Sequence, residues 1–354
     1  MKIPPKYFNI FLLTGLIFLS ACSSIQFPDY SSGIIPLYEQ PSDWKDPVKR
    51  DEAIKTFAKV LTGKKIFIDP GHGGEDRKNK SLKGRITEAD INLRVAKFLK
   101  KYFESAGAFV LMSRYEDTAV DLKARSELAN NSGADILISI HHNASGTADD
   151  YSSDYTSTFY HSNDENYDYE PCNRDLARYI QRDLSYVMRN SGGLGSFDGT
   201  YSDFIIYPKE GFAVLRNSKI PAVLVECAFH TSRFEEARLA FEEFNEIQAW
   251  GIFRGVGKYF RAGIPVIKYE ESLSVVSKDS TKLIFSFEDK NGIDEKTIKV
   301  FCDSLNTGFN YNKEINLMEV SPGVLSRGDH TLRIIAANKN KIYSFPFYRV
   351  FKIE

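Results

Sequence analysis

The chain has 354 residues, of which 42% are hydrophobic and 26% are charged, a composition typical of a globular protein long enough for about two domains. Its formal net charge is −1, so no extended field of one sign would draw it to a polyanion. We therefore expect no binding to nucleic acid.

The first 21 residues have the pattern of a secretory signal peptide. Lys2 and Lys6 precede an apolar run over residues 10–19, which is too short to cross a bilayer as a helix. The run ends in Leu-Ser-Ala-Cys at residues 19–22, which resembles the lipobox of bacterial lipoproteins. That resemblance implies cleavage before Cys22 and a lipid on it, so that the chain is held at a membrane outside the cytoplasm. The alternative is a plain secretory signal with a chance cysteine.

Residues 22–45 are polar and contain prolines and serines, which predicts a tether. Ser23 after the cysteine favours the periplasmic face of an outer membrane. Three further cysteines stand on distant segments without a C-x-x-C spacing, so we expect buried thiols and neither disulfides nor a zinc site: Cys172, Cys227 and Cys302.

Between residues 46 and 264 the predicted helices and strands alternate. Asp46 followed by Pro47 favours the start of a helix that runs to Leu61. Short apolar runs predict strands at 66–68, 109–112, 135–140, 158–160 and 221–225. Helical spacing of apolar residues predicts helices at 87–103, 121–130, 173–188 and 235–259. Near-continuous apolar strands between helices indicate an α/β domain, with a mostly parallel sheet covered by helices on both faces.

The chain from residue 265 to residue 354 is rich in strand-like segments and poor in helical ones. Turn signals separate the stretches "KLIFSFED", "TIKVFCD", "HTLRIIAAN" and "FPFYRVFKI". This pattern predicts a small antiparallel β-sandwich, and it resembles bacterial immunoglobulin-like modules. The segment carries no catalytic group that we recognise. We expect a spacer or stabilising module, with ligand binding as the alternative.

The stretch "KKIFIDPGHGGED" places one histidine, His72, in a glycine-rich loop directly after a predicted strand. Such a loop can hold a phosphate, but the lysine and hydroxyl of a P-loop are missing, and so is G-x-G-x-x-G. The loop is therefore a weak candidate for a phosphate site. The function of His72 has to be inferred from the other residues that could lie near it.

Several potential metal ligands follow the predicted strands. His141 and His142 come after the strand at 135–140, Glu226 after the strand at 221–225, and Glu88 begins the helix that follows His72. The carboxyl ends of parallel strands meet at one edge of a sheet, where ligand sites form. Two histidines and one glutamate suffice to hold a catalytic zinc with an open position, and a second glutamate can serve as general base. The residues alone do not choose between the two adjacent histidines.

Four segments in order, "IFIDPGHGGED", "TEADINL", "ISIHHNAS" and "VLRNSKIPAVLVECAF", resemble the motifs of the zinc-dependent N-acetylmuramoyl-L-alanine amidases. The resemblance covers residues 64–263. It implies hydrolysis of the amide between muramic acid and the first L-alanine of the peptidoglycan stem. It also implies His72, Glu88 and His141 as zinc ligands and Glu226 as the catalytic carboxylate.

The chain departs from the family pattern after Glu226. Ala228 stands where the family usually has glycine, and His230 stands where it has an aliphatic residue, which leaves the shape of the pocket open. Some relatives carry an autoinhibitory helix before the final glutamate motif. Only one amphipathic helix is predicted between residues 143 and 225, and the fold itself needs it, so we expect no such helix here.

Arg216 is the best candidate for a substrate contact, because a cation near the strand ends would suit the carboxylates of the stem; a structural ion pair is the alternative. Three functions are compared: a zinc amidase, a zinc endopeptidase acting on the stem, and a non-catalytic cell-wall binding lipoprotein. The presence of Glu226 and of all three implied ligands disfavours the last. The sequence does not indicate a protein activator, the preferred stem or the oligomeric state.

Overall fold

The computed structural model describes residues 39–146, 153–162, 169–192, 198–277 and 280–354. The predicted signal peptide, Cys22 and most of the predicted tether lie outside these residues. Residues Gln40–Glu354 form one compact unit. None of the described helices is long and apolar enough to cross a bilayer.

A seven-stranded sheet forms the centre of the N-terminal part, with the order β2-β1-β3-β7-β4-β5 and with β6 beside β4. Four strands run parallel: β1 Lys65–Pro70, β2 Phe109–Met112, β3 Ile136–Asn143 and β7 Ala222–Phe229. One strand, β4 Tyr155–Tyr160, is antiparallel to β7. Two short strands run parallel to β4: β5 Ser191–Gly192 and β6 Thr200–Ser202. The expected mostly parallel sheet is confirmed.

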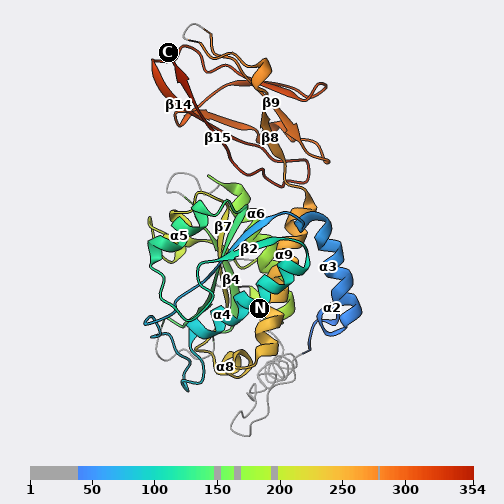
Figure 1. Ribbon diagram of the computed structural model, residues 1–354, viewed down its shortest axis with the longest axis vertical. Coiled ribbons are helices and arrows are strands. Elements are labelled where there is room, and N and C mark those ends of the chain that lie inside the picture. The colour runs from blue at the N-terminus through green and yellow to red at the C-terminus, as the bar shows by residue number, and fades with distance from the viewer. Residues whose placement is uncertain (1–38, 147–152, 163–168, 193–197, 278–279) are drawn as a thin grey trace, which may run out of the picture. The chain divides into compact units, whose positions relative to one another are not determined.

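Helices lie on both sides of this sheet (Figure 1). The α-helices are α2 Ser42–Lys45, α3 Pro47–Leu61, α4 Glu88–Ser105, α5 Leu122–Asn131, α6 Pro171–Met188, α7 Ala213–Arg216, α8 Arg233–Leu239 and α9 Glu242–Ala262. Short 3₁₀ segments are η2 Asp203–Ile205, η3 Glu271–Leu273 and η4 Glu295–Thr297. The predicted start of α3 is confirmed, because the Asp46 carboxylate accepts hydrogen bonds from the N–H groups of Val48 and Lys49.

The two faces of the sheet are covered by different helices. On one face, Phe67 and Leu224 belong to a buried cluster with Ala129 of α5 and Leu215 of α7. The other face is covered by α4, α6 and α9. There α9 lies so close to α6 that a Cβ on Gly255 would stand 2.5 Å from the Ile180 Cα. Burial on both faces explains why the strands read as continuous apolar runs.

Three sequence-based boundaries are wrong. The strands β3 and β7 extend beyond their apolar runs, so that His141, His142 and Glu226 lie within strands and not after them. A polar residue follows the apolar run in each strand, His141 in β3 and Glu226 in β7, so a pattern based on hydrophobicity ended both strands too early. The predicted closing helix is two helices, because Ser232 caps α8 and the Asn245 amide binds the Leu239 carbonyl where α8 ends.

Two four-stranded antiparallel sheets form the C-terminal part. One contains β8 Val266–Tyr269, β9 Leu283–Glu288, β12 Phe309–Asn312 and β13 Leu317–Val320. The other contains β10 Lys299–Cys302, β11 Leu305–Asn306, β14 Gly328–Ile335 and β15 Phe347–Ile353. Both contribute to one apolar core, for example Phe285 and Met318 from the first and Val300 and Leu332 from the second. The expected antiparallel sheets are confirmed, and the immunoglobulin-like relationship stays a prediction.

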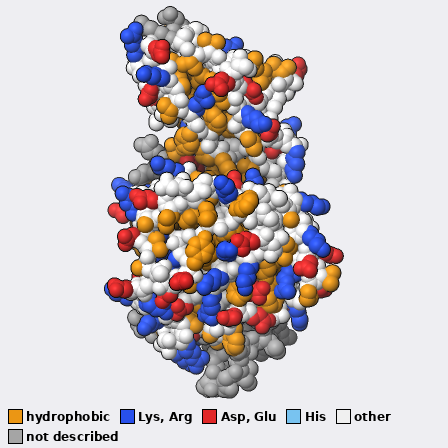
Figure 2. Space-filling model, viewed as in Figure 1, with side chains coloured by type: hydrophobic (Ala, Val, Ile, Leu, Met, Phe, Trp, Pro, Cys, Tyr) orange, Lys and Arg blue, Asp and Glu red, His pale blue; other side chains and the backbone are white. Residues whose placement is uncertain are grey.

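The surface and the thiols agree with the sequence-based expectations. Figure 2 shows acidic and basic side chains interspersed over the visible face, which is consistent with the net charge of −1. The three cysteines in the described part of the chain are buried and form no disulfide: Cys172, Cys227 and Cys302.

Candidate metal centre

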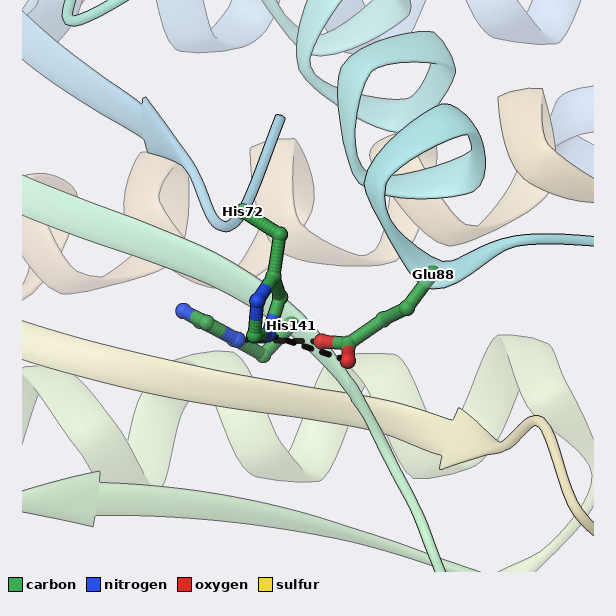
Figure 3. A group of neighbouring side chains, drawn as sticks. All are labelled: His72, Glu88 and His141. Carbon is green, nitrogen blue, oxygen red and sulfur yellow. Dashed lines mark hydrogen bonds and ion pairs between the residues drawn. The ribbon is translucent and has the colours of Figure 1, made fainter. Parts of the chain in front are cut away.

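Two neighbouring strands and one helix bring three potential ligands together at the carboxyl edge of the sheet (Figure 3). His72 comes two residues after β1, His141 lies near the end of β3, and Glu88 is the first residue of α4. Each of the three offers one ligand atom, and these atoms all lie within 4.8 Å of one another. The sequence predicted this convergence, although it placed His141 beyond its strand.

Glu88 stands between the two imidazoles. Its Oε2 atom lies 3.0 Å from His72 Nε2, and its Oε1 atom lies 3.0 Å from His141 Nδ1. The Glu88 side chain is 3% exposed, whereas the two histidines are about one-fifth exposed, at 21% and 19%. Two imidazoles and one carboxylate that remain open to solvent on the histidine side form a donor set that suits zinc.

The electrostatics of this group favour an ion pair when no metal is present. Burial acts to lower the pKa of His72, but the hydrogen bond to Glu88, the charge of Glu88 and the contact with Asp76 outweigh burial and raise the pKa to about 9. Burial acts to raise the pKa of Glu88, but the hydrogen bonds from His141 and His72 hold it well below its usual value. A metal that takes the His72 Nε2 atom must therefore displace a proton.

His142, the histidine next to His141, faces away from this group. Its ring is buried, its Nδ1 atom lies 2.7 Å from Asn92 Oδ1, and its Nε2 atom lies 3.0 Å from Gln248 Nε2. Burial lowers its pKa to about 3, so the ring is neutral at physiological pH. Because side chains alternate along a strand, adjacent histidines point to opposite faces, and only His141 reaches Glu88 with its ring. The choice that the residues alone left open is thereby made by geometry.

Glu226 lies on β7 directly opposite His141 of β3 in the register of the sheet. Its Oε2 atom is buried and has no hydrogen-bond partner among the described residues. Burial, followed by the negative charge of Glu88, raises the pKa of Glu226 well above its usual value, and His72 opposes this shift. Glu88 and Glu226 are thus neighbouring carboxyl groups whose environments shift their pKa values in opposite directions. Such a difference is typical of active sites in which two carboxyl groups have different acid–base roles.

Sequence reasoning missed the groups that hold Glu88. Asn79 Nδ2 donates to Oε2 at 2.7 Å, and Oε1 accepts from Asn92 Nδ2 at 3.2 Å and from the His142 N–H at 3.1 Å. The contact with Asn92 could have been predicted, because Asn92 follows Glu88 by four residues on one helix and therefore lies on the same side of it. The contact with Asn79 could not have been predicted, because only the path of a loop brings Asn79 to the Glu88 carboxylate.

Two buried arginines hold the loop that carries His72. Arg114 donates to the carbonyls of Pro70 and Gly71, both at 2.9 Å. Arg125 forms a buried ion pair with Asp69 and donates to the His72 carbonyl at 3.0 Å. The His72 backbone has φ +59°, a left-handed conformation that non-glycine residues adopt only where surrounding contacts stabilise it. The arginines supply these contacts.

His230, the residue that departs from the family pattern, lies one residue beyond β7 and is buried. Its Nε2 atom lies 4.0 Å from Glu88 Oε2. Burial lowers its pKa, against the effects of Glu88 and the Lys80 carbonyl, but no hydrogen bond of ordinary length reaches either ring nitrogen within the described structure. His230 thus lies behind Glu88, outside the group of three ligands.

Arg216 lies at the opposite edge of the sheet from His141 and Glu226. Its helix, α7, precedes β7, and Leu215 packs with Ala134 and Ala222, which stand at the amino-terminal ends of β3 and β7. The guanidinium group donates to the carbonyls of Glu210 and Gly211. The structure therefore places Arg216 away from the carboxyl ends of the strands, where its guanidinium group holds the turn before α7; a contact with substrate stays a prediction.

Gly71 provides a direct test of the geometry. A Cβ atom at this position would lie 2.2 Å from His141 Cε1, so Gly71→Ala must push the His141 ring away from Glu88. We expect this variant to lose the capacity to bind a divalent metal, as measured by metal content after dialysis against zinc. Gly308→Ala is the control, because nothing lies within 4 Å of a Cβ there. Full metal binding by a correctly folded Gly71→Ala protein would contradict this arrangement.

Comparison with known proteins identifies the family of the chain. Residues 66–258 match the model of the N-acetylmuramoyl-L-alanine amidase family. A germination-specific N-acetylmuramoyl-L-alanine amidase of Bacillus subtilis is 28% identical over 237 residues, which cover 61% of this chain and 88% of the relative.

Two solved structures are also similar. The N-acetylmuramoyl-L-alanine amidase of Clostridium difficile 630 is 32% identical, covers 57% of this chain and 98% of its own, and has a TM-score of 0.48. The amidase Ami1 of Mycobacterium smegmatis is 18% identical, covers 57% of this chain and 99% of its own, and shares the fold with a TM-score of 0.50. Because the family model matches more than half of the chain, the protein belongs to the N-acetylmuramoyl-L-alanine amidase family.

Proposed function

We propose that this protein is a zinc-dependent hydrolase that cleaves the amide between N-acetylmuramic acid and the L-alanine of the peptidoglycan stem. The observation that carries the proposal is the grouping of His72, Glu88 and His141 beside the buried Glu226, in a chain of the amidase family. A hydrolase that acts on peptidoglycan is what the family indicates. We propose in addition that the metal is zinc and that the individual residues have the roles described below.

The residues fit a zinc ion in number and in chemistry. Three ligand atoms lie within 4.8 Å of one another. A zinc ion with three protein ligands would have a fourth position for water or substrate. His72 Nδ1 lies 2.7 Å from Asp76 Oδ2, so that Nε2 is left for the metal, an arrangement that commonly orients a ligating histidine. The unpaired Glu226 Oε2 atom is a buried acceptor that needs a partner from outside the protein.

A zinc ion held there would polarise the substrate carbonyl and make a water molecule more acidic. Glu226 supplies the proton transfer: it takes the proton of the attacking water on a carboxylate oxygen and gives it to the departing amine nitrogen. Its pKa is raised by burial and by the charge of Glu88, which makes the carboxylate a stronger proton acceptor than an exposed glutamate. Asn79 and Asn92 hold Glu88 in one orientation, and this fixes the position of the centre relative to Glu226.

The reaction product decides between the two hydrolase functions. An amidase frees intact stem peptides with a new L-alanine amino terminus, whereas an endopeptidase leaves L-alanine on the muramic acid. We expect mass spectrometry of sacculi digested with the purified protein to show free stems that begin with L-alanine. Shortened stems that are still attached to glycan would point to the endopeptidase, and an undigested sacculus would point to a binding lipoprotein.

Replacement of the general base separates chemistry from metal binding. Glu226→Gln keeps the shape of the side chain but removes the proton acceptor, so turnover should fall by about 10²–10⁴-fold while zinc content stays at one per chain. His72→Ala and His141→Ala are the matched comparisons, and both should lose zinc as measured by elemental analysis. Loss of zinc from Glu226→Gln would make Glu226 a ligand. Native turnover in that variant would place the base elsewhere, with His142 and His230 as the next candidates.

We also propose that the protein acts outside the cytoplasm, anchored by a lipid on Cys22, with the C-terminal sheets as a spacer or stabilising module. The support is the lipobox-like sequence at residues 19–22 and the peptidoglycan substrate of the family. We expect Cys22→Ala to release the protein from the membrane fraction or to block removal of the signal peptide. Unchanged membrane association together with an unchanged mature mass would exclude Cys22 as the anchor.

A further inference from the structure

The loop that joins β1 to α4 ends in a stretch with an unusual charge. Residues 77–87, here called the basic hairpin, contain five lysines and arginines and no aspartate or glutamate, whereas the whole chain has a net charge of −1. The stretch lies between His72 and Glu88, so it runs from one member of the metal centre to another. Neither the fold nor the proposed chemistry requires positive charge there.

The basic hairpin has a defined backbone. The Glu88 N–H donates to the Asn79 carbonyl at 2.9 Å, Lys80 and Thr87 form an antiparallel bridge, and the Ser81 N–H donates to the Ile86 carbonyl at 3.0 Å. At the tip, the Lys83 N–H donates to a carboxylate oxygen of Glu236 on α8. The hairpin thus forms hydrogen bonds at its base with the start of α4 and at its tip with α8. These bonds fix the backbone positions from which its side chains extend.

Four of its cations are exposed and have no acidic partner. Arg77 forms ion pairs with Asp90 and Asp117, which neutralise it. In contrast, four side chains are exposed and form no ion pair within 4.0 Å in the described part of the chain: Lys78, Lys80, Lys83 and Arg85. An unpaired exposed cation is common, but four within eight residues form a local positive field on an otherwise balanced surface.

The field lies directly beside the metal centre. Asn79, whose side chain donates to Glu88 at 2.7 Å, stands between Lys78 and Lys80 in the chain. Consecutive Cα atoms are about 3.8 Å apart, so these two cations begin within one residue of the group that holds Glu88. The basic hairpin is therefore anchored to the metal centre through the side chain of Asn79, and its exposed cations start from the neighbouring positions of the chain.

The anionic part of the proposed substrate is its peptide. The carboxyl group of muramic acid is consumed in the scissile amide and the sugars are uncharged, so the negative charges are the carboxylates of the stem. An extended peptide advances about 3.3–3.6 Å per residue, so these carboxylates lie roughly 7–14 Å from the amide, two to four residues along. The carboxylates of a bound stem would therefore lie beside the centre and not within it.

We infer that the basic hairpin binds the free carboxylates of the stem peptide and makes this enzyme prefer stems whose acids are not amidated. This inference rests on the proposed function, because it takes the stem as the substrate. Exposed ion pairs contribute little individually, a factor of about 1.4–5 in affinity each, so the preference arises from several cations acting together.

The test compares two soluble muropeptides that differ only in whether the stem carboxylates are free or amidated. The full-length protein is compared with the variant Lys78→Gln/Lys80→Gln/Lys83→Gln/Arg85→Gln. We expect KM for the free-acid substrate to rise about three- to ten-fold, with kcat changed less than about two-fold, and KM for the amidated substrate to stay nearly constant. Raising NaCl from about 0.05 M to about 0.5 M should weaken binding of the free acid by the native protein in the same way.

The matched control removes four exposed lysines that lie elsewhere and have no ion pair in the described structure: Lys55, Lys59, Lys65 and Lys97. Its KM should equal that of the native protein; an equal rise in both variants would overturn the inference, because it would indicate an effect of net charge alone. Zinc content and melting temperature check the fold. If the fourfold variant loses zinc, the tip variant Lys83→Gln/Arg85→Gln, two cations farther from Asn79, replaces it.

Two failures can be told apart. If the native protein cleaves both muropeptides with the same KM, and the hairpin variants do the same, the proposed function stands and this inference is wrong. If it cleaves neither at the muramoyl–alanine amide, the proposed function fails. Equilibrium binding of the two muropeptides by the full-length protein then decides whether the hairpin still selects free carboxylates, and equal affinity for both would overturn the inference as well.

Discussion

The burial of the Glu88 carboxylate is the constraint on which the rest of the site depends. A carboxylate with 3% exposure is unstable in a protein interior unless each oxygen receives hydrogen bonds or an opposite charge. Here both oxygens are surrounded, by Asn79 and His72 on one side and by Asn92, His141 and the His142 N–H on the other. The partners come from the loop between β1 and α4, from α4 and from β3, so one buried charge fixes the relative positions of three segments.

The sheet supplies the rigidity that this arrangement needs. The strands β1, β3 and β7 are buried on both faces, and their parallel direction brings the loop after β1 and the ends of β3 and β7 to one edge. The left-handed backbone of His72 is kept in place by Arg125, and Gly71 leaves the space that the His141 ring occupies. Close packing and glycine are thus necessary at this edge for steric reasons, independently of the chemistry.

Two carboxyl groups of the same type acquire different properties from their surroundings. Glu88 receives hydrogen bonds from several donors, and these keep its pKa low and suit it to bind a cation. Glu226 is less buried as a residue, but its Oε2 atom is buried and has no donor among the described residues, and burial, followed by the negative charge of Glu88, raises its pKa. The two carboxyl groups thus differ in the number of hydrogen-bond donors, and their pKa values are shifted in opposite directions.

The sequence by itself determined the α/β class and the antiparallel C-terminal strands, because hydrophobic periodicity is a local property. The order of its motifs, through their resemblance to a family, also implied His72, Glu88 and His141 as a group. Only the tertiary structure decided the ends of β3 and β7, since a polar residue, His141 in β3 and Glu226 in β7, breaks the hydrophobic signal before the strand ends. It also placed Arg216 at the far edge and brought Asn79 to Glu88. Those positions depend on strand direction and on the path of a loop, and neither is encoded in the spacing of the residues concerned.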